Sequence, residues 1–185
     1  MSHRLIAALF FFTLFSLLLF SQTSAALNAD QPNPPDFSGT WTLDLEASSS
    51  IDPLMKQIGA SLLDRAYAAL AKFRVNLRQT DDKLTIATRA PGFALDQTLH
   101  LDGRTDPDNL ELFGATSIKA KATWSKEYKE LLEIHTIETK QGREGQLIIE
   151  RSLTDQGKMM LVIVTLQVNN QPDKTVARQV WHRES

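Results

Sequence analysis

The chain has 185 residues, with 20 basic and 22 acidic side chains and a formal net charge of −2 at pH 7. The charges are nearly balanced and form no long runs of one sign, so the chain lacks the excess of basic residues that binds nucleic acid. The chain contains no cysteine, which excludes a disulfide framework and leaves the hydrophobic core as the source of stability.

The first 26 residues have the three parts of a secretory signal. Arg4 is followed by an apolar run over residues 5–20 and then by small residues from Thr23 to Ala26. The apolar run is shorter than the roughly 20 residues that span a bilayer comfortably. We therefore expect a signal peptide at 1–25, cleaved after Ala25 or Ala26, and no stable membrane insertion after processing. A Pro-rich leader at 26–36 would precede the folded domain of a secreted or periplasmic protein.

The predicted domain, residues 37–185, begins with a strand over Phe37–Leu45 that carries Trp41, which we interpret as a core residue. Apolar residues then follow helical spacing over residues 51–73. Gly59 interrupts this stripe, Pro53 fits a first turn, and Ser61 with Asp64 resembles a capping box. We expect two short helices joined near Gly59 within residues 51–72, with an inward-facing stripe formed by Leu54, Met55, Ile58, Leu62 and Leu63.

From Phe73 onward, apolar and polar residues alternate with period two, which is typical of half-buried strands. The predicted strands are Phe73–Thr80, Lys83–Ala90, Phe93–Leu101, Asn109–Gly114, Ser117–Trp124, 131–139, 146–153, 159–168 and 175–183. Short strands without a later helix indicate an antiparallel sandwich or barrel, and closure removes exposed sheet edges. The predicted fold class is all-β: a closed up-and-down antiparallel β-barrel of about nine to ten strands, with a helix-turn-helix lid after strand 1.

Four segments resemble the fatty-acid-binding-protein family, which is related to the lipocalins within the calycins. They are FSGTW at Phe37–Trp41, the helical SIDPLMKQIGASLLDRAYAAL at Ser50–Leu70, IIERSLTDQGKMMLVIV at Ile148–Val164, and ARQVWHRE at Ala177–Glu184. The resemblance implies a calycin-like barrel that holds one small apolar ligand, such as a fatty acid or a related lipid.

The resemblance also implies three ligand-binding residues. In the family a carboxylate meets one Arg and an Arg-X-Tyr pair; Arg151 occupies the first position, while Gln179 and Trp181 stand where the pair would be. We expect Arg151 to meet an acidic head group, although this donor set suits either a carboxylate or a neutral head group. Leu147 and Ile149 share the parity of Arg151 and place it on the interior face. On the last strand, both alternating sets of residues are equally polar, so the sequence does not show which face points into the barrel.

The sequence contains no nucleophile elbow, no His-Glu-X-X-His and no phosphate-binding glycine loop. His100, His135 and His182 each lie alone on a predicted strand, and we interpret them as solvated. The acidic residues fall on predicted turns and outer faces. We therefore expect no enzyme, no catalytic residue, no metal and no cofactor.

Two functions remain open. The first is an exported binding protein with a small apolar ligand inside the barrel. The second is a lipocalin-like interaction or accessory protein of the cell envelope, whose core is filled by Phe73, Phe93, Trp124 and Trp181. Unfilled interior volume with a few convergent polar groups distinguishes the binding protein from the solid barrel. The sequence identifies no protein partner and no oligomeric state.

Overall fold

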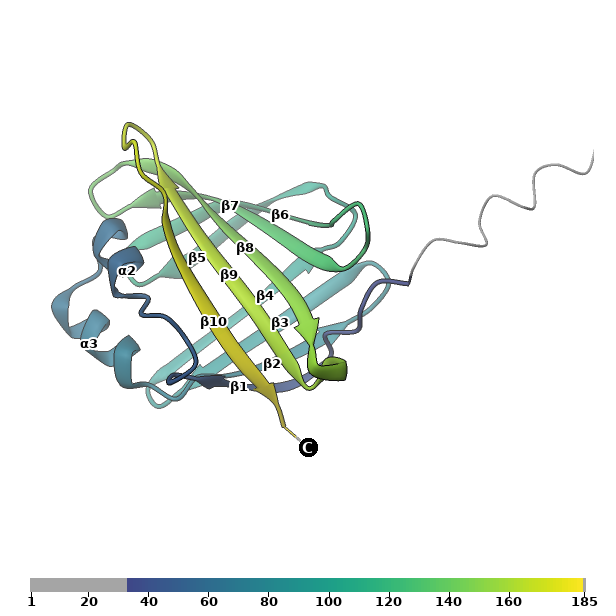
Figure 1. Cartoon of the computed structure of the whole chain (residues 1–185). Coiled ribbons are helices and arrows are strands. Elements are labelled where there is room, and N and C mark those ends of the chain that lie inside the picture. Colours follow the sequence, from purple (N-terminus) through teal and green to yellow (C-terminus); the bar gives the residue numbers. More distant parts are fainter. Residues whose placement is uncertain (1–32, 185) are drawn as a thin grey trace, which may run out of the picture. The chain divides into compact units, whose positions relative to one another are not determined.

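A computed structural model describes residues 33–184, so the predicted signal peptide and leader residues 26–32 lie outside the described residues. Two helices and ten strands form the domain (Figure 1). In chain order they are β1 (Gly39–Asp44), α2 (Asp52–Ile58), α3 (Leu62–Leu70), β2 (Arg74–Gln79), β3 (Lys83–Ala90), β4 (Phe93–His100), β5 (Thr105–Leu112), β6 (Ala115–Trp124), β7 (Glu130–Thr139), β8 (Glu144–Thr154), β9 (Met159–Val168) and β10 (Thr175–Arg183), with a short 3₁₀ turn η1 (Asp155–Gly157) between β8 and β9.

The strands form one antiparallel sheet in which every strand pairs with its neighbour in the chain except at one point. The order is β4-β3-β2-β1-β10-β9-β8-β7-β6-β5, so β1 joins the first half of the meander to the last strand. The remaining edges, β4 and β5, approach each other through side chains: His100 Nδ1 lies 2.7 Å from Asp106 Oδ2. The predicted up-and-down barrel with a helical pair after its first strand is confirmed, with a side-chain seam between β4 and β5.

The end of the barrel away from the helices is closed by aromatic packing. Trp41 is fully buried, and its Nε1 donates a hydrogen bond to the carbonyl of Phe37 at 3.0 Å. The Arg183 guanidinium lies 4.3 Å from the centre of the Trp41 ring, and Phe37 stacks on Trp124 at 6.0 Å. The interpretation of Trp41 as a core residue is confirmed.

The two helices lie at the opposite end of the barrel (Figure 1). Helix α2 ends at Gly59, whose φ of 90° suits glycine, and α3 begins with the expected capping box between Ser61 and Asp64. The turn between them sits directly on the β5–β6 turn, because a Cβ on Gly114 would come within 2.8 Å of the Ala60 backbone nitrogen. Within residues 33–184 no helix is long and apolar enough to span a bilayer.

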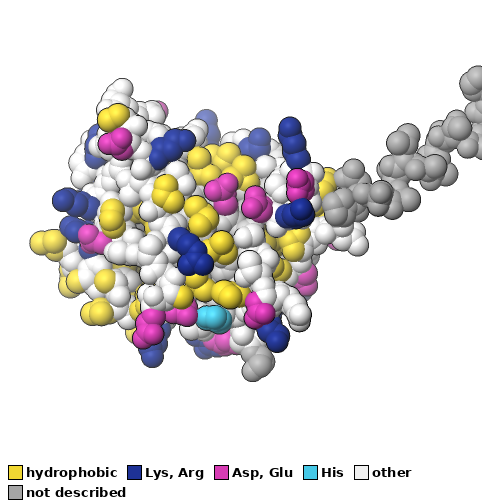
Figure 2. All heavy atoms as spheres, viewed as in Figure 1, with side chains coloured by type: hydrophobic (Ala, Val, Ile, Leu, Met, Phe, Trp, Pro, Cys, Tyr) yellow, Lys and Arg dark blue, Asp and Glu magenta, His cyan; other side chains and the backbone are white. Residues whose placement is uncertain are grey.

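The expected inward stripe is correct for α2 and wrong for the start of α3. Leu54 and Met55 are buried, with Leu54 at 6 % exposure, whereas Leu62 and Leu63 are 78 % and 79 % exposed. Hydrophobic side chains are visible on the surface at the helical end in Figure 2. The chain changes direction at Gly59, so the spacing of the first helix does not continue in phase into the second, and α3 buries Ala68 instead.

This arrangement predicts opposite results for the same substitution on the two helices. Leu62→Asp should change the free energy of unfolding by no more than about 0.5 kcal/mol, as is usual for an exposed position. Leu54→Asp should cost several kcal/mol, because it would bury an unpaired carboxylate. Urea unfolding of both variants measures the difference. A large loss for Leu62→Asp would mean that α3 presents its other face to the barrel.

Candidate functional site

A cavity of about 190 Å³ lies inside the barrel toward the helical end. Its lining is mostly aliphatic and aromatic, and Arg151 is the charged residue among the described residues that line it. All three residues predicted to bind a ligand, Arg151, Gln179 and Trp181, border this cavity. The other lining residues are Leu43, Ile51, Phe73, Val75, Ile86, Thr88, Phe93, Leu95, Phe113, Ile149, Val162 and Val164.

Strand register explains why the three predicted residues share one wall. Arg151 of β8 pairs with Val162 of β9, which in turn pairs with Gln179 of β10. Adjacent strands are about 4.8 Å apart, so the backbones of Arg151 and Gln179 are separated by roughly 10 Å. Trp181 lies two residues beyond Gln179 and therefore points to the same face. The inward face of the last strand, open in the sequence, is thus the one that carries Ala177, Gln179 and Trp181.

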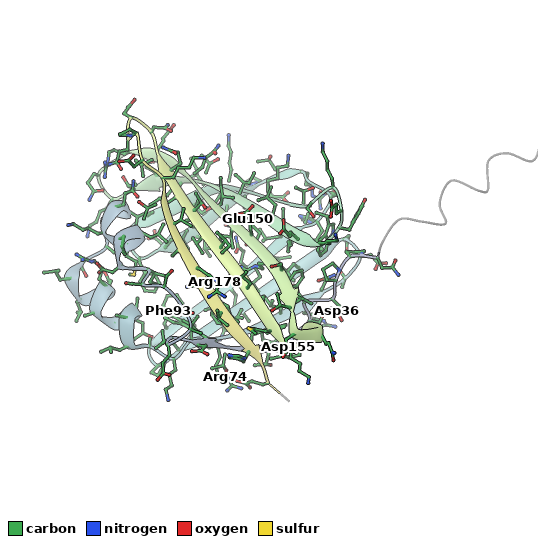
Figure 3. The ribbon with its side chains drawn as sticks, viewed as in Figure 1. Asp36, Arg74, Phe93, Glu150, Asp155 and Arg178 are labelled. Atoms are coloured by element: carbon green, nitrogen blue, oxygen red, sulfur yellow. The ribbon has the colours of Figure 1, made fainter. Side chains whose placement is uncertain are left out.

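Aromatic side chains bound the cavity at the helical end. Phe93 stacks on Phe113 with ring centres 4.9 Å apart, and Phe73 meets Phe93 edge-on at 5.6 Å. Tyr67 of α3 continues the series, 6.1 Å from Phe73, and its hydroxyl donates to the Pro91 carbonyl. Figure 3 shows Phe93 on the side of the barrel where the helices lie. These rings connect α3 to the β3–β4 and β5–β6 turns, so Phe73 and Phe93 border the cavity and leave its volume open.

Several hydrogen-bond donors at the cavity have no partner within residues 33–184. The Trp181 Nε1–H is buried and unpaired. The half-buried Gln179 amide and the Nη1 of Arg151 also make no side-chain hydrogen bond there. A buried donor without an acceptor costs about 1–3 kcal/mol. The wall therefore presents donors to which an acceptor oxygen of a bound molecule would bond favourably.

Arg151 has a partner that the sequence analysis did not identify. Its Nε donates to Glu133 Oε1 at 2.5 Å and its Nη2 to Glu133 Oε2 at 3.3 Å, in a bidentate pair. Glu133 is fully buried on the inner face of β7, so the expectation that acids lie only on turns and outer faces is wrong for this residue. Glu133 shares parity with the apolar Leu131 and Ile137, but Leu132 and Ile134 have the opposite parity, so the alternation on β7 gives no signal that places Glu133 inside.

His135, two residues further along β7, is also buried, so its interpretation as a solvated histidine is wrong. Its Nδ1 lies 3.1 Å from Ser117 Oγ and 3.4 Å from Asp108 Oδ2, and its Nε2 lies 3.8 Å from Glu133 Oε2. Asp108 also accepts a hydrogen bond from Gln97 of β4 at 3.3 Å, across the β4–β5 seam. A polar network therefore runs from the seam to the cavity wall.

The network lacks the geometry of nucleophilic catalysis. In a Ser-His-acid triad the serine and the acid contact different ring nitrogens, so that the histidine relays a proton between them. Here Ser117 and Asp108 both approach Nδ1 of His135. Ser117 is fully buried and does not line the cavity. We therefore interpret these groups as a buried ionic cluster.

The cluster raises the pKa of His135 and lowers the pKa values of Glu133 and Asp108. Burial opposes charge on His135, but the carboxylates of Asp108 and Glu133 outweigh it and raise the pKa of His135 to about 9. Burial likewise opposes charge on Glu133, but the Arg151 guanidinium and His135 lower the pKa of Glu133 to about 2. At neutral pH the cluster thus contains two cations, Arg151 and His135, and two anions, Glu133 and Asp108.

These shifts predict a stability plateau with a fall on each side. The raised pKa of His135 contributes stability that is complete below its unfolded value of 6.5 and is lost as pH rises through about 9. The lowered pKa of Glu133 contributes stability that is complete above 4.5 and is lost as pH falls toward about 2. Urea unfolding across this range should be flat from about pH 5 to 6.5, and His135→Gln should flatten the alkaline fall. An alkaline fall that persists in His135→Gln would assign it to another group.

Comparisons with known proteins give consistent results. No family model matches the chain. Cellular retinoic acid-binding protein 1 of Takifugu rubripes is 28 % identical over 97 residues, which cover 51 % of this chain and 67 % of that protein. Lipid binding protein 8 of Caenorhabditis elegans aligns with a TM-score of 0.62 at 14 % identity, over 80 % of this chain and 95 % of the other. A Schistosoma mansoni fatty acid binding protein, solved with arachidonic acid, aligns with a TM-score of 0.60 at 20 % identity. The alignment covers 80 % of this chain and 96 % of the other.

Proposed function

We propose that this chain, which resembles fatty-acid-binding proteins in fold and a retinoic acid-binding protein in sequence, is an exported protein that binds one small apolar ligand inside its barrel. The apolar part of the ligand contacts the aliphatic and aromatic lining, and its polar end contacts Arg151, Gln179 and Trp181. A role as a carrier rather than an enzyme agrees with the relatives, which are named for the lipids and retinoids they bind.

One observation supports this proposal most strongly: the buried, unpaired Trp181 Nε1–H borders an apolar cavity. A buried donor without an acceptor costs about 1–3 kcal/mol, and an acceptor oxygen of a ligand would remove this cost. Among the described residues, the other buried polar atom without a hydrogen bond, His135 Nε2, does not border the cavity. Ligand sites combine an apolar lining with a few polar groups that fix orientation. The cavity wall around Trp181 has this composition.

The second candidate, an envelope accessory protein with a solid core, is favoured by cavity size. The volume of about 190 Å³ is below the ~300–1,000 Å³ usual for ligand pockets. A ligand that fits this volume is compact.

Mass spectrometry separates the two candidates. The protein should be purified without detergent and analysed under native conditions, and its organic extract should be compared with that of Val162→Phe, in which a phenyl ring would occupy the cavity. We expect a bound small amphiphile in the wild type at up to one equivalent and its loss in the variant. Identical extracts from both proteins, together with no adduct in the native spectrum, would favour the solid barrel.

Export is a separate part of the proposal and rests on the signal pattern of residues 1–26, with cleavage after Ala25 or Ala26. N-terminal sequencing of protein from the native host should return Ala26 or Leu27. A mature chain that still begins at Met1 would contradict export by signal cleavage.

A further inference from the structure

The charge at the cavity wall determines which head group the site can accept. Arg151 is the cation that borders the cavity, and a guanidinium free to bind would favour a carboxylate ligand. Its Nε and Nη2 already donate to Glu133, which is 0 % exposed and cannot be replaced by solvent. The two guanidinium nitrogens that could bind a ligand carboxylate in bidentate fashion therefore already bind a carboxylate of the protein.

Among the described residues, the surroundings of this ion pair contain no surplus positive charge. His135 lies 3.8 Å from Glu133 and 3.4 Å from Asp108, so the second buried cation is also matched by an anion. The cluster contains two cations and two anions, and Glu150, the acidic neighbour of Arg151 in sequence, is exposed on the outer face of β8 (Figure 3). A ligand carboxylate would add a further anion to this matched set without a counter-ion, and burying an uncompensated charge is strongly unfavourable.

The groups that remain available suit a neutral oxygen. The Trp181 Nε1–H and the Gln179 amide are neutral donors, and Arg151 retains only Nη1 without a partner. A hydroxyl or carbonyl oxygen accepts from such donors without adding charge. A neutral head group would therefore satisfy the orphaned indole donor and leave the Arg151–Glu133 pair intact.

We infer that the ligand is a neutral amphiphile, with an alcohol, aldehyde, ester or amide head group, and that Glu133 is the specificity residue that excludes carboxylates by occupying Arg151. This inference rests on the proposed function and selects between the two classes of head group that the donor set alone leaves open.

The test compares 1-octanol with octanoate at pH 7.5, by calorimetric titration of the full processed chain. In the wild type the alcohol should bind at least 10-fold more tightly than the acid. In Glu133→Gln, which keeps an acceptor for Arg151 but removes the negative charge, octanoate should tighten by about 10- to 150-fold, the range of one charge-assisted hydrogen bond. The affinity for the alcohol should change by less than about threefold.

Glu150→Gln is the matched control, because it removes the same charge from the adjacent residue on the outer face of the wall. It should leave the acid-to-alcohol ratio unchanged. Thermal melting provides a second measurement: octanoate should raise the melting temperature of Glu133→Gln and leave that of the wild type unchanged.

The outcomes separate this inference from the proposed function. Octanoate binding to the wild type as tightly as octanol, or more tightly, would overturn the inference and leave the binding function standing. Equal tightening of acid and alcohol in Glu133→Gln would also overturn it, because the residue would then act through cavity shape. If neither ligand binds to the wild type, the proposed function fails, and the inference fails with it. If Glu133→Gln does not fold, the wild-type ratio alone decides.

Discussion

Glu133→Leu should lower the free energy of unfolding by about 3–5 kcal/mol, because it leaves the Arg151 guanidinium buried without its counter-ion. A loss of this size is a large part of the ~5–15 kcal/mol by which domains are stable. The reciprocal change, Arg151→Leu, should cost a similar amount, since it strands a fully buried carboxylate. Urea unfolding at pH 6, on the expected stability plateau, measures both.

The double variant Glu133→Leu/Arg151→Leu tests the cause. Replacing both members of a buried ion pair by apolar residues is often neutral or stabilising, so the double variant should be much more stable than either single variant. Glu150→Leu, on the exposed face of β8, should change stability by no more than about 0.5 kcal/mol. If the two single losses simply add in the double variant, the two side chains do not act as a pair.

Val162→Phe should weaken binding of a small amphiphile at least ~50-fold. Val162 lies between Arg151 and Gln179 on the cavity wall, so a phenyl ring there would take the place of several ligand methylenes. Each buried methylene contributes about 0.8 kcal/mol, and the loss of three corresponds to about 2.4 kcal/mol. The fold should tolerate the ring because the cavity has space for it. Titration with 1-octanol measures the loss.

Val176→Phe is the control for this substitution. Val176 is on the neighbouring strand β10, faces outward and is 58 % exposed, so the same added bulk should leave octanol affinity unchanged. Full-strength binding by Val162→Phe would place the ligand outside the cavity.

The fold was largely predictable because its signals are local. Alternation with period two marks most of the strands, although β5 begins at Thr105 rather than at the predicted Asn109. The capping box at Ser61 and the break at Gly59 mark the helices. The register of β8, β9 and β10 then brings Arg151, Gln179 and Trp181 to one cavity. The prediction for α3 was wrong because Leu62 and Leu63 follow a change of chain direction. The spacing of apolar residues in one helix does not predict which face of the next helix points inward after such a turn.

The buried cluster was not predictable, for a different reason. β7 carries apolar residues on both faces, so its pattern does not identify the face on which Glu133 and His135 lie. The ion pair also joins residues 18 positions apart, and His135 meets Asp108 where β5 has a register shift between Pro107 and Leu110. Contacts that depend on strand register and on a bulge require three-dimensional information.

The most direct test of ligand binding at this wall is the indole N–H resonance of Trp181, followed by nitrogen-15 NMR during titration with 1-octanol. The chain has three tryptophans, and Trp→Phe variants assign their indole signals. The Trp41 Nε1–H already donates to the Phe37 carbonyl, whereas that of Trp181 has no acceptor. Binding in the cavity predicts that the Trp181 signal moves and saturates at one equivalent while the Trp41 signal stays in place. A Trp181 signal that does not move, or three signals that drift together without saturating, would contradict a ligand site at this wall.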